Sequence, residues 1–105
     1  MKISLMSGRL GQRMTEFLML TQDDCHECER LKQMLARPLK GRYDAVIEVV
    51  HRTAQPEAFA EQVERYHLRK TPVLIHPASG DVLTDTASLG AVGAFLKART
   101  SLTSA

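Results

Sequence analysis

Residues 17–28 read FLMLTQDDCHEC, an apolar run followed by turn formers and then by both cysteines of the chain. The apolar run is short and bounded by turn formers, which predicts a buried strand at residues 16–21. A helix is expected to begin near Cys25, so that Cys25 and Cys28 form a Cys-x-x-Cys pair at its N-terminus. The free N–H groups and partial positive charge of a helix N-terminus favour a thiolate over a thiol. This combination is typical of a thiol–disulfide site.

The helix that begins at the cysteine pair carries one apolar face. Cys28, Leu31 and Leu35 recur at helical spacing and are expected to face the core. Asp24 is the expected N-cap residue, because a short acidic side chain can accept a hydrogen bond from the first helical turn. The helix is expected to stop near Pro38, since proline lacks the N–H that an interior helical position donates.

The rest of the chain predicts three further strands and two further helices. The segments rich in β-branched and aliphatic residues are expected to be strands, at residues 45–50, 71–75 and 81–84. A turn at residues 77–80, PASG, separates the last two strands. One helix is expected from Pro56, because proline suits a first helical turn, and another after Ser88, which can act as its cap.

The predicted order is β-α-β-α-β-β-α. The first two strands are joined by a helix, so they are expected to be parallel neighbours, and the last two are close enough to form a hairpin. The prediction is therefore an α/β fold, a four-stranded mixed sheet flanked by helices on both faces, as one domain over residues 15–99. Residues 1–14 are expected to be an extension that is disordered or forms an edge strand, and residues 100–105 a frayed tail.

Composition restricts the class of protein. The chain has 105 residues, of which 44% are hydrophobic and 25% charged, as in an ordinary globular domain with one core. Its net charge of +2 is too small to indicate a nucleic-acid or anionic-membrane partner. No apolar run approaches the roughly 20 residues of a membrane span, and no export signal is recognised. A cytoplasmic location is therefore expected, where paired cysteines are more often redox centres or metal ligands than structural cross-links.

Three segments resemble the thioredoxin-like superfamily, and the similarity extends over residues 15–99 at the level of element order. They are the strand followed by Cys25-His26-Glu27-Cys28, residues 68–75 (LRKTPVLI), and residues 79–83 (SGDVL) with the closing helix. The second of these looks like the segment that carries the superfamily's cis-proline. Together they imply a thioredoxin-like fold and redox chemistry, without naming a substrate.

The resemblance implies a role for each of four residues. Cys25 would be the nucleophile that attacks a substrate disulfide, and Cys28 the more buried cysteine that resolves the mixed disulfide. A cis bond before Pro72 would place the Thr71 backbone beside the dithiol, where it would pair with an extended substrate. Thr71 and Pro72 are therefore the predicted substrate-binding residues.

The chain departs from both main groups of the superfamily. Thioredoxins usually carry Trp before the first cysteine and a buried Asp six residues before it, where this chain has Asp24 and Met19. Their central dipeptide is Gly-Pro, whereas this one is His26-Glu27. Glutaredoxins usually have Cys-Pro-Tyr-Cys, and a Gly-Gly pair after the sheet that residues 84–89 lack. We therefore expect a divergent thioredoxin/glutaredoxin-type protein with slower exchange, because Met19 cannot take part in proton transfer.

The charged neighbours of the nucleophile have opposite expected effects. His26, as an imidazolium, would stabilise the thiolate, or it is simply an exposed residue that the turn tolerates. Glu27 and Asp24 would raise the thiol pKa, although they complement the helix dipole. Glu27, His26 or water would have to move the proton of the resolving thiol. The acidic patch that these carboxylates form with Asp23 and Glu29 either selects a basic partner or is a solvated helix start.

The leading hypothesis is an enzyme, a thiol–disulfide oxidoreductase that acts as a disulfide reductase on a protein substrate and is recycled by an unidentified reductase. We expect a monomer that requires no cofactor. One alternative is metal binding through Cys25 and Cys28, completed by His26 or a second subunit, because zinc requires four ligands. Another is a thioredoxin-like interaction module with a residual dithiol. The other histidines are expected to be surface or strand residues rather than ligands: His51, His67 and His76.

Overall fold

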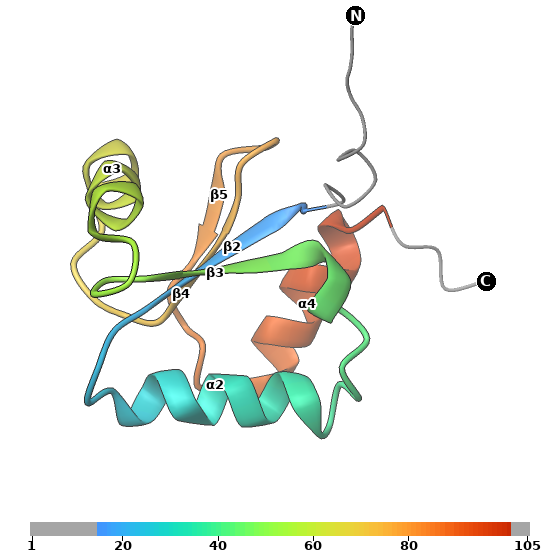
Figure 1. The fold of residues 1–105 in the computed structure, drawn as a ribbon. Helices are drawn as coiled ribbons and strands as arrows, with labels where there is room; N and C mark the ends of the chain where they lie inside the picture. Colours follow the sequence, from blue (N-terminus) through green and yellow to red (C-terminus); the bar gives the residue numbers. More distant parts are fainter. Residues whose placement is uncertain (1–14, 102–105) are drawn as a thin grey trace, which may run out of the picture.

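The computed structural model describes residues 15–101 (Figure 1). The expectations for residues 1–14 and for the last four residues lie outside this described part. The elements in chain order are β2 (Phe17–Thr21), α2 (His26–Ala36), the 3-10 helix η1 (Asp44–Val46), β3 (Ile47–His51), α3 (Pro56–Tyr66), β4 (Val73–His76), β5 (Asp81–Leu83) and α4 (Leu89–Arg99). The predicted mixed α/β succession of four strands and three helices is confirmed.

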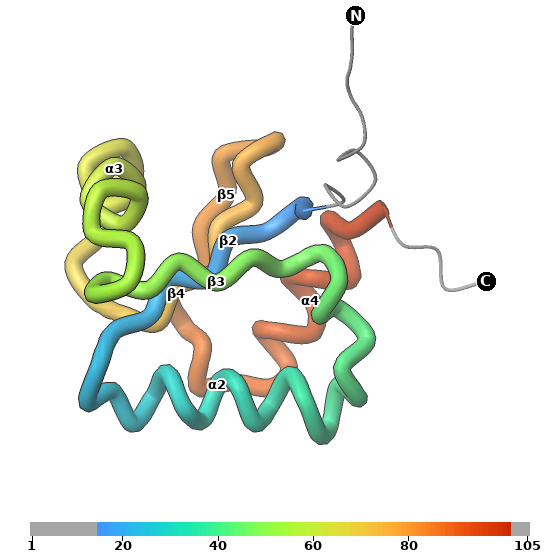
Figure 2. Tube along the Cα trace, in the orientation of Figure 1, coloured from blue at the N-terminus to red at the C-terminus, as the bar shows by residue number. Residues whose placement is uncertain are grey.

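The four strands form one mixed sheet in the order β3-β2-β4-β5 (Figure 2). β2 and β3 are parallel neighbours, with Thr21 opposite His51, and β4 and β5 form an antiparallel hairpin. Both pairings were predicted. β2 is also antiparallel to β4, with Leu20 opposite Val73. The residues that follow β2 and those that precede β4 therefore meet at one edge of the sheet.

Alternate residues of the central strands contribute to two separate hydrophobic clusters, because successive side chains of a strand point to opposite sides. The cluster with α2 and α4 contains Phe17, Met19, Leu74 and the helical residues Leu31, Leu35, Val92, Phe95 and Leu96. The cluster with α3 contains Leu20, Val50, Val73 and Ile75, against which Phe59, Val63 and Leu68 pack. Both clusters thus fix β2 and β4, the two strands whose ends carry the cysteine segment and Thr71.

The starts of two strands lie two residues later than predicted. The segment expected as a strand at 45–50 begins with η1, and β3 then runs to His51. The segment expected at 71–75 becomes a strand only at Val73. Thr71 and Pro72 precede it in a cis peptide, as the resemblance implied.

Candidate active site

The two cysteines lie at the first turn of α2 and are joined in a disulfide, with their Cα atoms 5.2 Å apart. The structure therefore represents the oxidised form of the pair. The predicted placement at a helix N-terminus is confirmed, and it follows from the sequence: β2 ends at Thr21, a turn of three polar residues follows, and the helix begins at His26.

The N-cap residue is Cys25, so the prediction of Asp24 at this position is wrong. Cys25 has the extended backbone of a cap (φ −122°, ψ 99°), and the Cys28 N–H donates to its Sγ atom at 3.1 Å. Asp24 instead adopts a left-handed conformation with φ 53°, which acidic and amide residues tolerate better than most. The sulfur of Cys25 thus occupies the place at which a helix binds a negative charge.

The two sulfurs differ in accessibility. Cys28 is only 1% exposed and lies with Leu31 and Leu35 among the buried residues of α2. Cys25 is half-buried. A substrate disulfide can therefore approach Cys25 more readily than Cys28.

Thr71, which precedes β4, lies beside Cys25, which follows β2. The Cys25 Sγ atom is 4.0 Å from the Thr71 backbone oxygen and 3.7 Å from Thr71 Oγ1. The antiparallel pairing of β2 with β4 explains this contact, because it places the end of one strand beside the start of the other. The structure thus brings together three of the predicted site residues, Cys25, Cys28 and Thr71, and Pro72 follows directly.

His26 and Glu27 are exposed at the start of α2. Within residues 15–101, neither side chain makes a hydrogen bond or an ion pair. Their predicted roles in stabilising the thiolate and moving a proton therefore stay predictions. Met19 is 2% exposed and belongs to the core, so an apolar side chain occupies the buried position that the resemblance singled out.

A polar link between two turns was not predicted. His51 Nε2 lies 3.2 Å from Asp23 Oδ1, and Thr53 Oγ1 donates to Asp23 Oδ2 at 2.9 Å. The residue before Asp23 and the residue after His51 are also joined, because Arg52 Nη1 donates to Gln22 Oε1 at 3.1 Å. These contacts therefore join the turn before the cysteines to the end of β3 and the turn that follows it. The parallel register of β2 with β3 is the signal that could have indicated this link.

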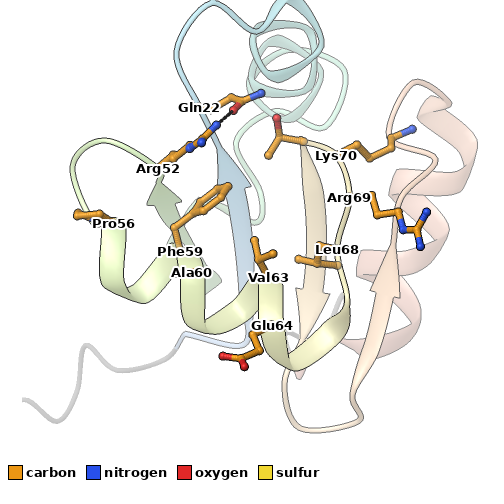
Figure 3. Close-up of a pocket in the computed structure, with 11 residues that line it drawn as sticks. Gln22, Arg52, Pro56, Phe59, Ala60, Val63, Glu64, Leu68, Arg69 and Lys70 are labelled. Atoms are coloured by element: carbon orange, nitrogen blue, oxygen red, sulfur yellow. Dashed lines mark hydrogen bonds between the residues drawn. The ribbon is translucent and has the colours of Figure 1, made fainter.

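A groove of about 570 Å³ runs along α3 (Figure 3), and Thr71 is one of its lining residues. Its residues come from three separate segments: Gln22 after β2, residues 52–64 around α3, and residues 68–71 before β4. No motif marks it, since it arises only when the β2–β4 and β2–β3 pairings bring these segments together. Its volume lies within the usual range of ligand sites, about 300–1,000 Å³.

The part of the chain that the structure describes contains no group of three or more cysteine, histidine or acidic side chains placed to hold a metal ion. In the same part of the chain, no helix is long and apolar enough to cross a membrane.

No protein-family model and no curated protein matches the sequence of this chain. Three features of the structure indicate a function: the cysteine pair at the start of α2, its contact with Thr71 and the adjoining groove.

Proposed function

We propose that this protein is a thiol–disulfide oxidoreductase that reduces protein disulfides through Cys25 and Cys28. The observation that carries the proposal is the position of Cys25 Sγ at the N-cap of α2, where it accepts the Cys28 N–H at 3.1 Å. In the reduced protein, the same N–H and the helix dipole would favour the Cys25 thiolate, which is the reactive species in disulfide exchange.

The fold supports a thioredoxin-like type. The sheet order, the two clusters on alternate residues of the central strands and the Thr71–Pro72 cis peptide beside the cysteines all agree with it. In a fold of this type, α2 and α4 would lie on one face of the sheet and α3 on the other. Thr71 and Pro72 would then bind an extended substrate backbone next to the reactive sulfur.

The proposed reaction balances as a two-electron transfer. The Cys25 thiolate attacks one sulfur of the substrate disulfide, the substrate S–S bond breaks, and one substrate thiolate leaves and takes up a proton. The Cys28 thiolate then attacks Cys25 Sγ, which releases the second substrate thiolate and forms the Cys25–Cys28 disulfide. An external thiol reductant must reduce this disulfide to complete the cycle.

Trapping with the variant Cys28→Ser tests the proposal. Because this variant cannot resolve a mixed disulfide, incubation of the reduced variant with insulin should give a covalent adduct on Cys25 that dithiothreitol releases. The matched variant Cys25→Ser should give little adduct, since its remaining thiol is buried. Equal adduct formation by both variants, or no catalysed insulin reduction by the unaltered protein, would argue against the proposal.

A further inference from the structure

The groove beside Cys25 has an apolar floor. Its apolar lining residues are Pro56, Phe59, Ala60, Val63 and Leu68. Three of them, Phe59, Val63 and Leu68, are only partly buried where they pack on the α3 cluster, so each keeps some surface free for a ligand. The floor can therefore accept an aliphatic or aromatic side chain.

The rim of the same groove is cationic. Arg52, Arg69 and Lys70 are exposed lining residues, and none of them forms an ion pair with a carboxylate within residues 15–101. The lining contains one acidic residue, Glu64, which lies at the end opposite Gln22 and Arg52 (Figure 3). The lining therefore contains three cationic side chains and one acidic side chain.

A carboxylate close to Gln22 and Arg52 is already engaged. Asp23, the neighbour of Gln22, contacts His51 Nε2 and accepts a hydrogen bond from Thr53 Oγ1. Arg52 itself contacts only the neutral oxygen of Gln22 among the described side chains. Asp23 is thus held by other partners, and none of the ion pairs among the described residues involves Arg52, Arg69 or Lys70.

The groove is also joined to the reactive sulfur. Thr71 lines the groove, and its Oγ1 atom lies 3.7 Å from Cys25 Sγ. A polypeptide whose disulfide reaches Cys25 must place its neighbouring residues close to Thr71. Residues on one side of the substrate cysteine can then enter the groove.

Building on the proposed function, we propose that this groove selects protein substrates whose reactive cysteine is flanked by an apolar residue and by acidic residues. The apolar side chain would lie on the floor formed by Phe59, Val63 and Leu68, and the carboxylates would face Arg52, Arg69 and Lys70. Charge complementarity of this kind mainly raises the rate of association and excludes wrong partners.

A matched peptide series tests the inference. Each of three peptides carries a single cysteine as a thiopyridyl disulfide. This cysteine stands next to Glu-Leu-Glu in the first peptide, Gln-Leu-Gln in the second and Lys-Leu-Lys in the third. The rate of reaction of each peptide with the reduced protein is measured in a stopped-flow instrument. We expect the acidic peptide to react roughly tenfold faster than the lysine peptide at low salt. Salt at about 0.5 M should largely remove the difference, because it screens exposed charges.

Two double variants locate the effect. Arg69→Gln with Lys70→Gln should reduce the preference for the acidic peptide several-fold. Arg30→Gln with Arg37→Gln removes the same charge from exposed residues that line a different groove beside α2, and it should leave the preference unchanged. A similar loss in both double variants would overturn the assignment of selectivity to this groove. Circular dichroism of each variant shows that the fold is kept.

Dithiodipyridine, a small uncharged disulfide, separates failure of this inference from failure of the proposed function. If the reduced protein reacts with it through Cys25 but treats the three peptides alike, the groove does not select charge. If a preference appears only for glutathione disulfide and not for the peptides, a protein segment is not the occupant. If Cys25 reacts with none of these disulfides, the proposed function itself fails.

Discussion

At the scale of single residues, Cys25 and Cys28 differ in their exposure to solvent, although they are only three positions apart. Cys25 is half-buried at the N-cap of α2, whereas Cys28 is 1% exposed. After reduction, a short pulse of iodoacetamide at neutral pH should therefore alkylate Cys25 at least about tenfold faster. Mass mapping of the labelled peptides measures this ratio. Faster labelling of Cys28 would reverse the roles of nucleophile and resolving cysteine.

Thr21, the last residue of β2, carries a buried hydroxyl without a hydrogen-bond partner. Its side chain is 0% exposed, and Oγ1 has no partner within the described residues. An unsatisfied buried hydroxyl is costly, so Thr21→Val should raise the free energy of unfolding by about 1 kcal/mol. Urea denaturation measures the change.

Thr53→Val is the control for Thr21→Val, because it removes a hydroxyl that has a hydrogen-bond partner. The Thr53 hydroxyl is exposed and donates to Asp23 at 2.9 Å, so its loss should lower stability slightly or leave it unchanged. A clear loss of stability in Thr21→Val would show that the buried hydroxyl has a partner that stabilises the fold.

The residues of the candidate site could be predicted from the sequence, whereas the backbone conformations of Asp24 and Cys25 could not. The Cys-x-x-Cys pair at a helix start was predictable, because its spacing and the preceding apolar run are local features. The N-cap was misassigned, since Asp24 and Cys25 are adjacent and either can accept a hydrogen bond from the first turn. Only the backbone decides between them, with Asp24 at φ 53° and Cys25 extended.

At the scale of elements, His51 fastens the turn after β3 to the turn before α2. Its Nδ1 atom accepts the N–H groups of Thr53 and Ala54 at 3.1 and 3.3 Å, while Nε2 faces Asp23. His51→Leu should therefore speed hydrogen exchange at the Thr53 and Ala54 amides by about tenfold. NMR measures this exchange. The control variant His76→Leu should leave exchange at the Thr53 and Ala54 amides unchanged, because the His76 ring lies beside Ser79. Unaltered protection in His51→Leu would show that the link is not needed to hold the turn.

A second contact joins β5 to α4 and depends on pH. Arg99 Nε donates a hydrogen bond to Asp81 Oδ2 at 3.0 Å. This bond lowers the pKa of Asp81 below its ordinary value of 3.8, and a hydrogen bond with Ser79 lowers it further. Because the pKa is lowered in the folded state, this stabilisation is fully present above the ordinary value and is lost as the pH falls through the lowered pKa. The carboxyl is exposed, so the effect on stability is small.

Arg99→Met tests this contact, since methionine keeps an apolar stem near Phe95 but removes the charge. An NMR titration of the Asp81 carboxyl should show its pKa returning toward 3.8 in the variant. An identical titration curve in both proteins would show that Arg99 does not set the pKa.

The order of elements was predictable because apolar spacing, prolines and turn residues are local signals. The contacts between the elements were harder to predict from the sequence. The strand expected from residue 45 begins as a 3-10 helix, and the pairing of Asp23 with His51 required the register of β2 against β3. Long-range polar contacts of this kind depend on side chains that no local pattern distinguishes from ordinary surface residues.

At the scale of the whole molecule, the sheet pairings assemble the candidate site from separate segments. The antiparallel pairing of β2 with β4 brings Thr71 to Cys25, and the parallel pairing of β2 with β3 brings the start of α3 beside them. The groove could not have been predicted from the sequence, because its lining comes from three parts of the chain that only the complete sheet unites.

Equilibration of the protein in glutathione buffers of graded potential is the direct test of reversible disulfide formation between Cys25 and Cys28. The Cys25–Cys28 disulfide should form and break reversibly, as a two-electron couple, with the fold retained. The negative charges of Asp24 and Glu27 are predicted to oppose the thiolate of the reduced form, so the midpoint should lie at or below the cytosolic glutathione potential, roughly −220 to −260 mV. A pair that does not interconvert, or a midpoint near the roughly −120 mV of a strong oxidant, would contradict the assignment as a disulfide reductase.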